Sequence, residues 1–274
     1  MRIVNMIGDF RVLIEECKTT GKWEAFRNYY NKYPELWEKI LGYLYMINLE
    51  GLEPMVETVD FDSLLEKVEE NVHKIDEIER ITQEVVEKLQ FAEEFDLYIG
   101  VGLGHVSGMA SLGNKPILYL GLECIGDSEL AYLIPHEVNH MVRGWSVQEI
   151  HPNDFKERMI AEGLGTLYPI LFNKEAINEE TLAKALLIPS ERMAVLLNNE
   201  VELTRNVFEK MEFTLTPELM KEFFTYKADE EQSQLAGYFV GMRMIQRLIE
   251  KGESIQRLTV MPADEMIVKY QAIL

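Results

Sequence analysis

Strand-forming sequence is confined to one short stretch of this 274-residue chain, and that constrains the fold more than any other feature. Residues 96–101 and 116–125 are rich in β-branched, leucine and tyrosine residues, and five glycines fall within 100–113. On both sides the apolar residues recur every three or four positions, which is typical of amphipathic helices. Helices before and after one small mixed or antiparallel sheet indicate an α+β fold that is mostly helical, rather than an alternating βαβ chain.

The helical regions can be divided further by their periodicity and their turn signals. Residues 62–94 carry apolar side chains at helical spacing and predict one long amphipathic helix. The helix that begins near Asp127 is expected to end at Gly144, and the next one to begin at Asp154 and to be limited by Pro169. The remaining expected helices cover 12–17, 23–33, 36–48, 179–187, 190–212, 217–227, 233–250 and 262–272. We predict a helical N-terminal region over 1–95 and a second domain over 96–274.

The charge balance argues against several classes of partner. Lys and Arg total 27 and Asp and Glu total 47, a net charge of −20. Such a surface repels phosphate backbones and anionic lipid heads, so we expect neither nucleic acid nor a membrane as partner. No signal peptide and no apolar run of ~18 residues is seen, which predicts a cytoplasmic protein.

The motif that carries chemistry is His-Glu-x-x-His at residues 136–140. With 3.6 residues per turn, His136 and His140 share one face of a helix, where their imidazoles can converge on one Zn²⁺. Glu137 lies beside that face, placed to act as a base toward water rather than as a ligand. The apolar flanking residues indicate a buried helix, where unpaired histidines are costly.

A catalytic zinc site needs a third protein ligand. Ser146 occupies the position where the metzincin pattern has its third histidine, so a glutamate on the next helix is the remaining solution. Glu162 follows His140 by enough chain for an antiparallel helix to return beside the first. Gly163 and Gly165 are expected to let these two helices approach closely.

Other interpretations of these residues remain open. Glu162 could form an ordinary surface ion pair with Arg158, one turn earlier, and Glu157 is a second ligand candidate that fits a capping box better. A closed structural zinc site would need a fourth ligand, for which Cys124 is a poor candidate on a strand.

With these residues in place, the sequence resembles the gluzincin class of zinc metallopeptidases. It is also similar to a bacterial family of predicted zinc-dependent proteases that is named as a domain of unknown function. The resemblance covers about 96–250 and implies a zincin-like packing of the sheet on the two helices. It implies His136, His140 and Glu162 as zinc ligands, with Glu137 as general base. The sequence departs from thermolysin-like members at Thr166, where they place an aspartate, and it lacks the aminopeptidase motif Gly-x-Met-Glu-Asn.

The same resemblance suggests an oxyanion donor and a place for substrate. Tyr238, within the Gly-Tyr segment 237–241, is the tentative donor, and His151 and His105 are alternatives. Tyr238 could equally be a core residue at a tight helix crossing. Gluzincins hold extended peptides against a sheet edge, so the strand 116–125 is expected to be that edge, unless it is an ordinary internal strand.

Together these features predict a zinc-dependent peptidase acting on peptide or protein substrates. One alternative is a zinc hydrolase of a non-peptide amide. Another is a non-catalytic peptide-binding protein on a peptidase-like zinc fold, against which the intact Glu137 argues. A third is a structural zinc site within a helical interaction module.

Overall fold

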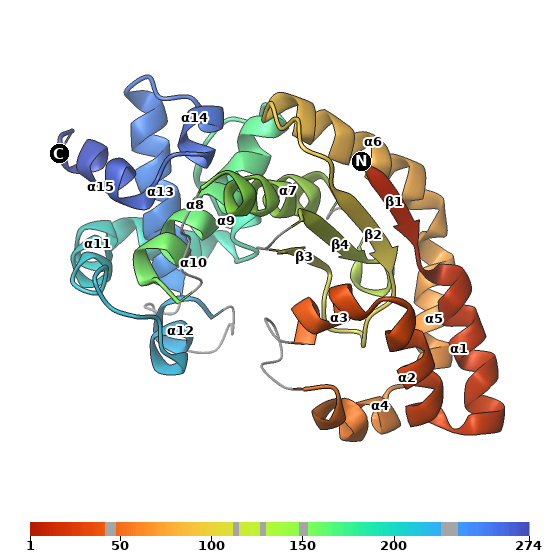
Figure 1. Ribbon diagram of the computed structural model, residues 1–274. Helices are drawn as coiled ribbons and strands as arrows, with labels where there is room; N and C mark the ends of the chain where they lie inside the picture. The colour runs from red at the N-terminus through yellow and green to blue at the C-terminus, as the bar shows by residue number, and fades with distance from the viewer. Residues whose placement is uncertain (42–47, 112–114, 127–129, 148–152, 226–234, 274) are drawn as a thin grey trace. The chain divides into compact units, whose positions relative to one another are not determined.

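The computed structural model describes the chain except for residues 42–47, 112–114, 127–129, 148–152, 226–234 and 274. It has a four-stranded mixed sheet and many helices, which confirms the α+β class (Figure 1). The strands are β1 (Arg2–Asn5), β2 (Asp96–Gly100), β3 (Gly108–Ser111) and β4 (Ile117–Gly121). The first helices are α1 (Ile7–Thr20), α2 (Lys22–Lys32), α3 (Pro34–Ile40), α4 (Glu53–Thr58), α5 (Phe61–Asn71) and α6 (Ile75–Lys88). The later helices are α7 (Leu130–Ser146), α8 (Phe155–Phe172), α9 (Glu179–Ala185), α10 (Ser190–Asn198), α11 (Glu200–Phe208), α12 (Pro217–Phe223), α13 (Ala236–Glu250), α14 (Ile255–Thr259) and α15 (Ala263–Gln271).

The chain forms two compact units. The first comprises Met1–Gln83 and Ala92–Leu133, and the second comprises Glu84–Phe91 and Ile134–Leu274. Helices α6 and α7 each contribute to both units. The domain boundary predicted at residue 95 remains a prediction, since compact units of this kind need not be independent domains.

The sheet belongs to the first unit, and its strand order corrects one expectation. The order is β1-β2-β4-β3, with β1, β2 and β4 parallel and β3 antiparallel to β4. Strand β4 is therefore paired on both sides, and the predicted edge position of 116–125 is wrong. Its buried pattern agrees with this, because parallel internal strands are covered on both faces.

Helices pack around this sheet within the first unit. Phe10 of α1 makes edge contacts with Tyr29 of α2 and Phe61 of α5, and the Tyr29 hydroxyl donates to the carbonyl of Val101 just after β2. The long helix predicted over 62–94 is divided into α5 and α6 by the 3-10 turn Val72–Lys74. Apolar spacing survives such a turn, because three residues per turn differ little from 3.6.

In its described residues the second unit consists of helices and loops, with one isolated β-bridge between Asp154 and Thr214, and α8 with α13 forms its centre. Both helices bury most of their residues and contact each other along their length. Asp154 caps α8 through the N–H groups of Lys156 and Glu157, as expected. However, Gly144 does not end α7, and Pro169 lies inside α8.

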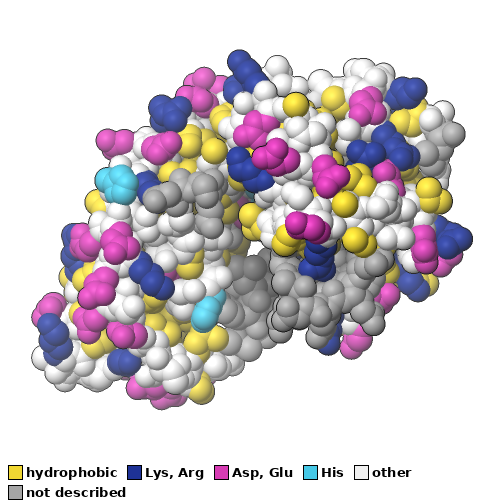
Figure 2. All heavy atoms as spheres, turned by 180° about the vertical axis from the view of Figure 1, so that it is seen from behind, with side chains coloured by type: hydrophobic (Ala, Val, Ile, Leu, Met, Phe, Trp, Pro, Cys, Tyr) yellow, Lys and Arg dark blue, Asp and Glu magenta, His cyan; other side chains and the backbone are white. Residues whose placement is uncertain are grey.

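For the side chains that the structure describes, the acidic excess is not gathered into one patch on the face of the molecule in Figure 2. In the view of Figure 2, acidic and basic side chains intermingle, with apolar side chains between them. Among the described residues, no helix combines the length and the apolar character needed to cross a membrane. The cytoplasmic location remains a prediction.

Candidate metal centre

Two helices of the second unit bring three metal-binding side chains together. His136 and His140 lie one turn apart on α7, and Glu162 lies on α8. Their candidate ligand atoms all lie within 4.8 Å of one another, and among the described residues this is the group of His, Cys, Asp and Glu side chains that could hold a metal ion. The four-residue spacing of His136 and His140 thus brings both imidazoles to one point, as the sequence predicted.

The spacing of the three donor atoms fits zinc. The Nε2 atoms of His136 and His140 are 2.9 Å apart, and Oε2 of Glu162 lies 3.6 and 3.4 Å from them. Tetrahedral zinc with ligands at ~2.0–2.1 Å holds its donor atoms roughly 3.3 Å apart. Two imidazoles and a carboxylate are also donors that zinc accepts in open sites.

A hydrogen bond to the backbone of α8 orients the ring of His136 on the side away from the candidate metal. The ring donates this hydrogen bond to the backbone of Gly165, and its Nδ1 atom would lie 3.1 Å from a Cβ added there. His140 would also be crowded by such a Cβ, at 3.1 Å from Nε2. Gly165 therefore lets α8 pass beneath both imidazoles, which confirms the expected close approach at this residue.

Gly163 serves a different contact from the one expected. A Cβ at Gly163 would collide with the backbone of Gly241 and Met242 on α13, not with α7. A Cβ at Gly241 would in turn collide with the carbonyl of Met159. Backbones of α8 and α13 thus touch at this crossing.

Tyr238 lies one turn before that crossing and is buried, with 6% of its surface exposed. Its side chain interacts with Arg158, Glu162 and Glu137, and burial raises the pKa of its phenol. Tyr238 therefore lies at a tight helix crossing, as expected for a core residue. It also lies near the candidate ligands, as expected for an oxyanion donor.

The electrostatics of the three candidate ligands are coupled. Burial, together with the charge of the neighbouring His140, lowers the pKa of His136 to about 4. For His140, burial opposes the charged form, but Glu162 outweighs it and raises the pKa. Glu162 is buried, yet the charges of Arg158 and the histidines hold its pKa well below the usual range. The group therefore presents an ionised carboxylate and a neutral imidazole, the forms that bind a cation.

Several other candidates lie elsewhere. Glu157 is not part of the group, since both its oxygens accept from Arg143, at 2.6 and 2.7 Å. His105 is exposed in the first unit, and Cys124 also lies in that unit, apart from the three candidate ligands. His151 and the expected start of α7 at Asp127 lie outside the described residues.

The Arg143–Glu157 pair is the main feature that the sequence did not reveal. Arg143 is buried on α7, and its Nη1 also donates to the carbonyls of Thr259 and Met261 at 3.1 and 3.0 Å. It joins the helix that carries both histidines to α8 and to the end of α14. The available signal was a charged residue seven positions after His136, two turns along the same face of the predicted helix.

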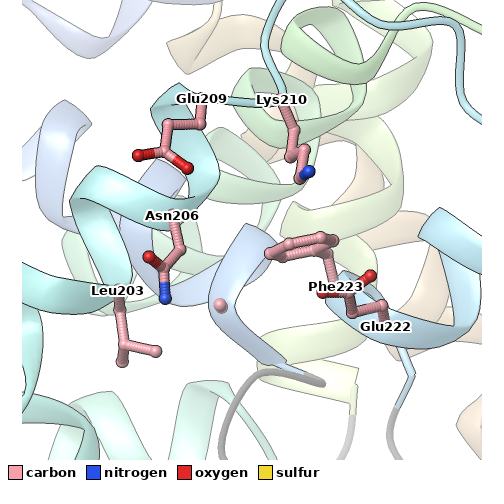
Figure 3. A pocket seen from close by; sticks show the side chains of 7 residues that line it. Leu203, Asn206, Glu209, Lys210, Glu222 and Phe223 are labelled. Carbon is pink, nitrogen blue, oxygen red and sulfur yellow. The ribbon is translucent and has the colours of Figure 1, made fainter.

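A separate pocket of about 130 Å³ also lies in the second unit (Figure 3). It is lined by residues of α11, α12, the turn after α11 and the first residue of α13: Leu203, Asn206, Glu209, Lys210, Glu222, Phe223 and Ala236. None of the predicted site residues lines it.

Fold and site define a class: α+β proteins whose adjacent helices present two histidines and a glutamate suited to a metal ion. The chain belongs to the family described as "Predicted Zn-dependent protease (DUF2268)", whose model matches residues 89–268. This confirms the resemblance to a family of predicted zinc-dependent proteases. Neither a curated protein nor a solved structure matches the chain.

Proposed function

We propose that the protein is a zinc-dependent peptidase, with His136, His140 and Glu162 as the zinc ligands. The observation that carries the proposal is the convergence of these side chains at zinc spacing, with Glu137 outside the group. Membership of a family described as zinc-dependent proteases by prediction supports it. Bound zinc would supply a Lewis acid that polarises a peptide carbonyl and lowers the pKa of water toward ~7.

Glu137 is the proposed general base. It follows His136 on α7, is partly exposed, and lies close enough to His140 and Tyr238 for its charge to raise both pKa values. Its carboxylate would accept the proton of the attacking water and return it to the leaving amine. A structural zinc module has no need for a carboxylate at this position.

Tyr238 is the proposed donor to the developing oxyanion. Burial keeps its phenol protonated, its side chain hydrogen-bonds with that of Arg158, and it lies close enough to Glu162 for that charge to raise its pKa. The hydroxyl can then donate a hydrogen bond to the carbonyl oxygen as its charge grows. The substrate is expected to be a peptide or a protein. Strand β4 is paired on both sides and therefore has no free edge along which a peptide could bind.

The test compares wild type with Glu137→Gln on a mixed peptide library near neutral pH. Gln has nearly the same shape but cannot accept the proton, so hydrolysis should fall by a factor of ~10²–10⁴. Zinc content and thermal stability should be unchanged. The exposed Glu202→Gln on α11 is the matched control and should retain full activity.

Three results would contradict the proposal. Loss of zinc in Glu137→Gln would make Glu137 a ligand, and equal hydrolysis by both proteins would point to another base. A wild type that binds zinc but cuts no peptide in the library would favour the peptide-binding alternative.

A further inference from the structure

The two carboxylate oxygens of Glu162 face different partners, and Arg158 is one of these partners. It lies one turn before Glu162 on α8, and its Nη2 atom is 2.9 Å from Oε1 of that residue. The other oxygen, Oε2, is the one that faces the two histidines, at 3.4 and 3.6 Å. The ion pair and the ligand role are therefore compatible, because each uses a different oxygen.

We propose that Arg158 is a positioning residue for the metal site, which holds Oε1 of Glu162 so that Oε2 alone faces the ion. This inference rests on the proposed function of the same site. The terminal torsion of a glutamate is broad, so an unrestrained carboxylate can turn either oxygen, or both, toward a cation. A guanidinium is planar and keeps its charge, which makes it suited to fixing one oxygen in place.

Burial makes this restraint effective. The Glu162 side chain is 6% exposed and that of Arg158 is 24% exposed, so solvent screens their attraction only in part. The carboxylate also needs a partner before any metal arrives, because an uncompensated buried charge is strongly destabilising. Arg158 supplies that partner and keeps the ligand in the conformation that zinc requires.

Arg158 also connects the ligand to the proposed oxyanion donor. Its side chain hydrogen-bonds with that of Tyr238, which α13 places here through the Gly163–Gly241 crossing. One cation thus orients a ligand of α8 and a hydroxyl of α13. Removing it should disturb both, in contrast to an arginine that only holds helices together.

Zinc affinity measured by competition with a chromogenic chelator tests this role. Arg158→Met should weaken zinc binding by ~10–100-fold, the usual effect of losing a group that orients a metal ligand. Arg158→Lys keeps the charge without the planar guanidinium, so its zinc affinity should lie between those of wild type and Arg158→Met. The matched control is Arg243→Met on α13, because Arg243 is 20% exposed and pairs with Glu200 away from the metal group. This control should bind zinc like wild type.

Thermal unfolding of the metal-free proteins separates positioning from stability. Both methionine variants should lose stability, but zinc affinity should fall in Arg158→Met alone. Unchanged affinity in Arg158→Met, or an equal loss in Arg243→Met, would overturn the proposal. If Arg158→Met does not fold, Arg158→Lys and Arg243→Lys form the deciding pair.

The result can be distinguished from failure of the proposed function. A wild type that binds no zinc would overturn both proposals. A wild type that binds zinc without cutting peptides would count against the peptidase alone, and the difference between the variants would still decide the role of Arg158.

Discussion

At the scale of single residues, Glu123 is the most unusual side chain outside the metal centre. It follows β4, is 6% exposed, and its Oε1 atom accepts from the N–H of Gly102 at 2.6 Å. Its Oε2 atom lies buried without a hydrogen-bond partner among the described residues. Burial raises the pKa of this carboxyl to about 7, although the backbone N–H groups oppose the shift. The first unit thus retains a proton here that the unfolded chain releases near pH 4.5.

This proton makes stability depend on pH. The folded pKa is raised, so the native state binds more protons, and the free energy of unfolding should fall as pH rises from about 4.5 to about 7. Glu123→Gln keeps an acceptor for Gly102 and removes the titration. It should therefore raise the free energy of unfolding at pH 8, on the order of 1–3 kcal/mol, with little change at pH 4.5.

Urea unfolding at both pH values measures this difference. The exposed Glu66→Gln on α5 serves as control and should follow the wild-type pH dependence. A Glu123→Gln protein with the same loss of stability toward pH 8 as wild type would show that another group binds the proton.

The metal centre shows what residue patterns can and cannot predict. His136 and His140 follow from helical geometry alone, and Glu162 from the length of chain needed to return antiparallel. The pairing of Glu157 with Arg143 could not be predicted, because it depends on how α7 and α8 rotate against each other. The sequence offered a local use for Glu157, as a capping residue, and the tertiary partner prevailed.

At the scale of helices, the crossing of α8 and α13 is the contact that sets the site. It depends on two glycines, Gly163 and Gly241, whose backbones meet directly. Gly241→Ala would force its Cβ against the Met159 carbonyl, and backbone cannot turn aside as a flexible side chain does. We expect a loss of at least ~1–3 kcal/mol in the free energy of unfolding, as for other overpacked sites. Zinc affinity should fall with it.

Gly8→Ala is the matched control for this prediction. Gly8 lies in α1 with nothing within 4 Å of an added Cβ, so alanine should be neutral or stabilising, by up to ~1 kcal/mol. Denaturant unfolding compares the two. Equal effects would mean that helix propensity, not the crossing, decides the outcome.

Helix boundaries were predicted less well than helix identities, for a physical reason. Gly144 ends a helix only if it takes the left-handed conformation, and among the described residues the glycines with positive φ are Gly21, Gly104 and Gly252. Pro169 lies within α8, whose last turns it does not interrupt. Local signals permit a boundary, but packing of the buried α7 and α8 decides whether it is used.

At the scale of the whole molecule, the sequence predicted the α+β class but not the full sheet. Strand β1 is four residues long and pairs in parallel with β2, which lies much later in the chain. Strand β3 lies in the glycine-rich stretch, where local propensity is weak. Long-range pairing therefore determined both strands, and β3 made β4 internal.

The division into two units predicts an uneven response to metal removal. The candidate ligands lie in the second unit, and metal-binding free energy is partly folding free energy. Chelation should accelerate amide hydrogen exchange in α8, measured by mass spectrometry, and leave α1 and α2 at their original rates. Equal acceleration in both units, or none in α8, would contradict this expectation.

The most direct measurement is anomalous X-ray diffraction at the zinc edge from crystals of the zinc-loaded protein. Our account predicts one peak at ~2.0–2.2 Å from Nε2 of His136, Nε2 of His140 and Oε2 of Glu162. Glu137 should stay outside the coordination sphere, and Arg158 should still hold Oε1 of Glu162. A peak bound by other side chains, or no peak in protein saturated with zinc, would contradict the account.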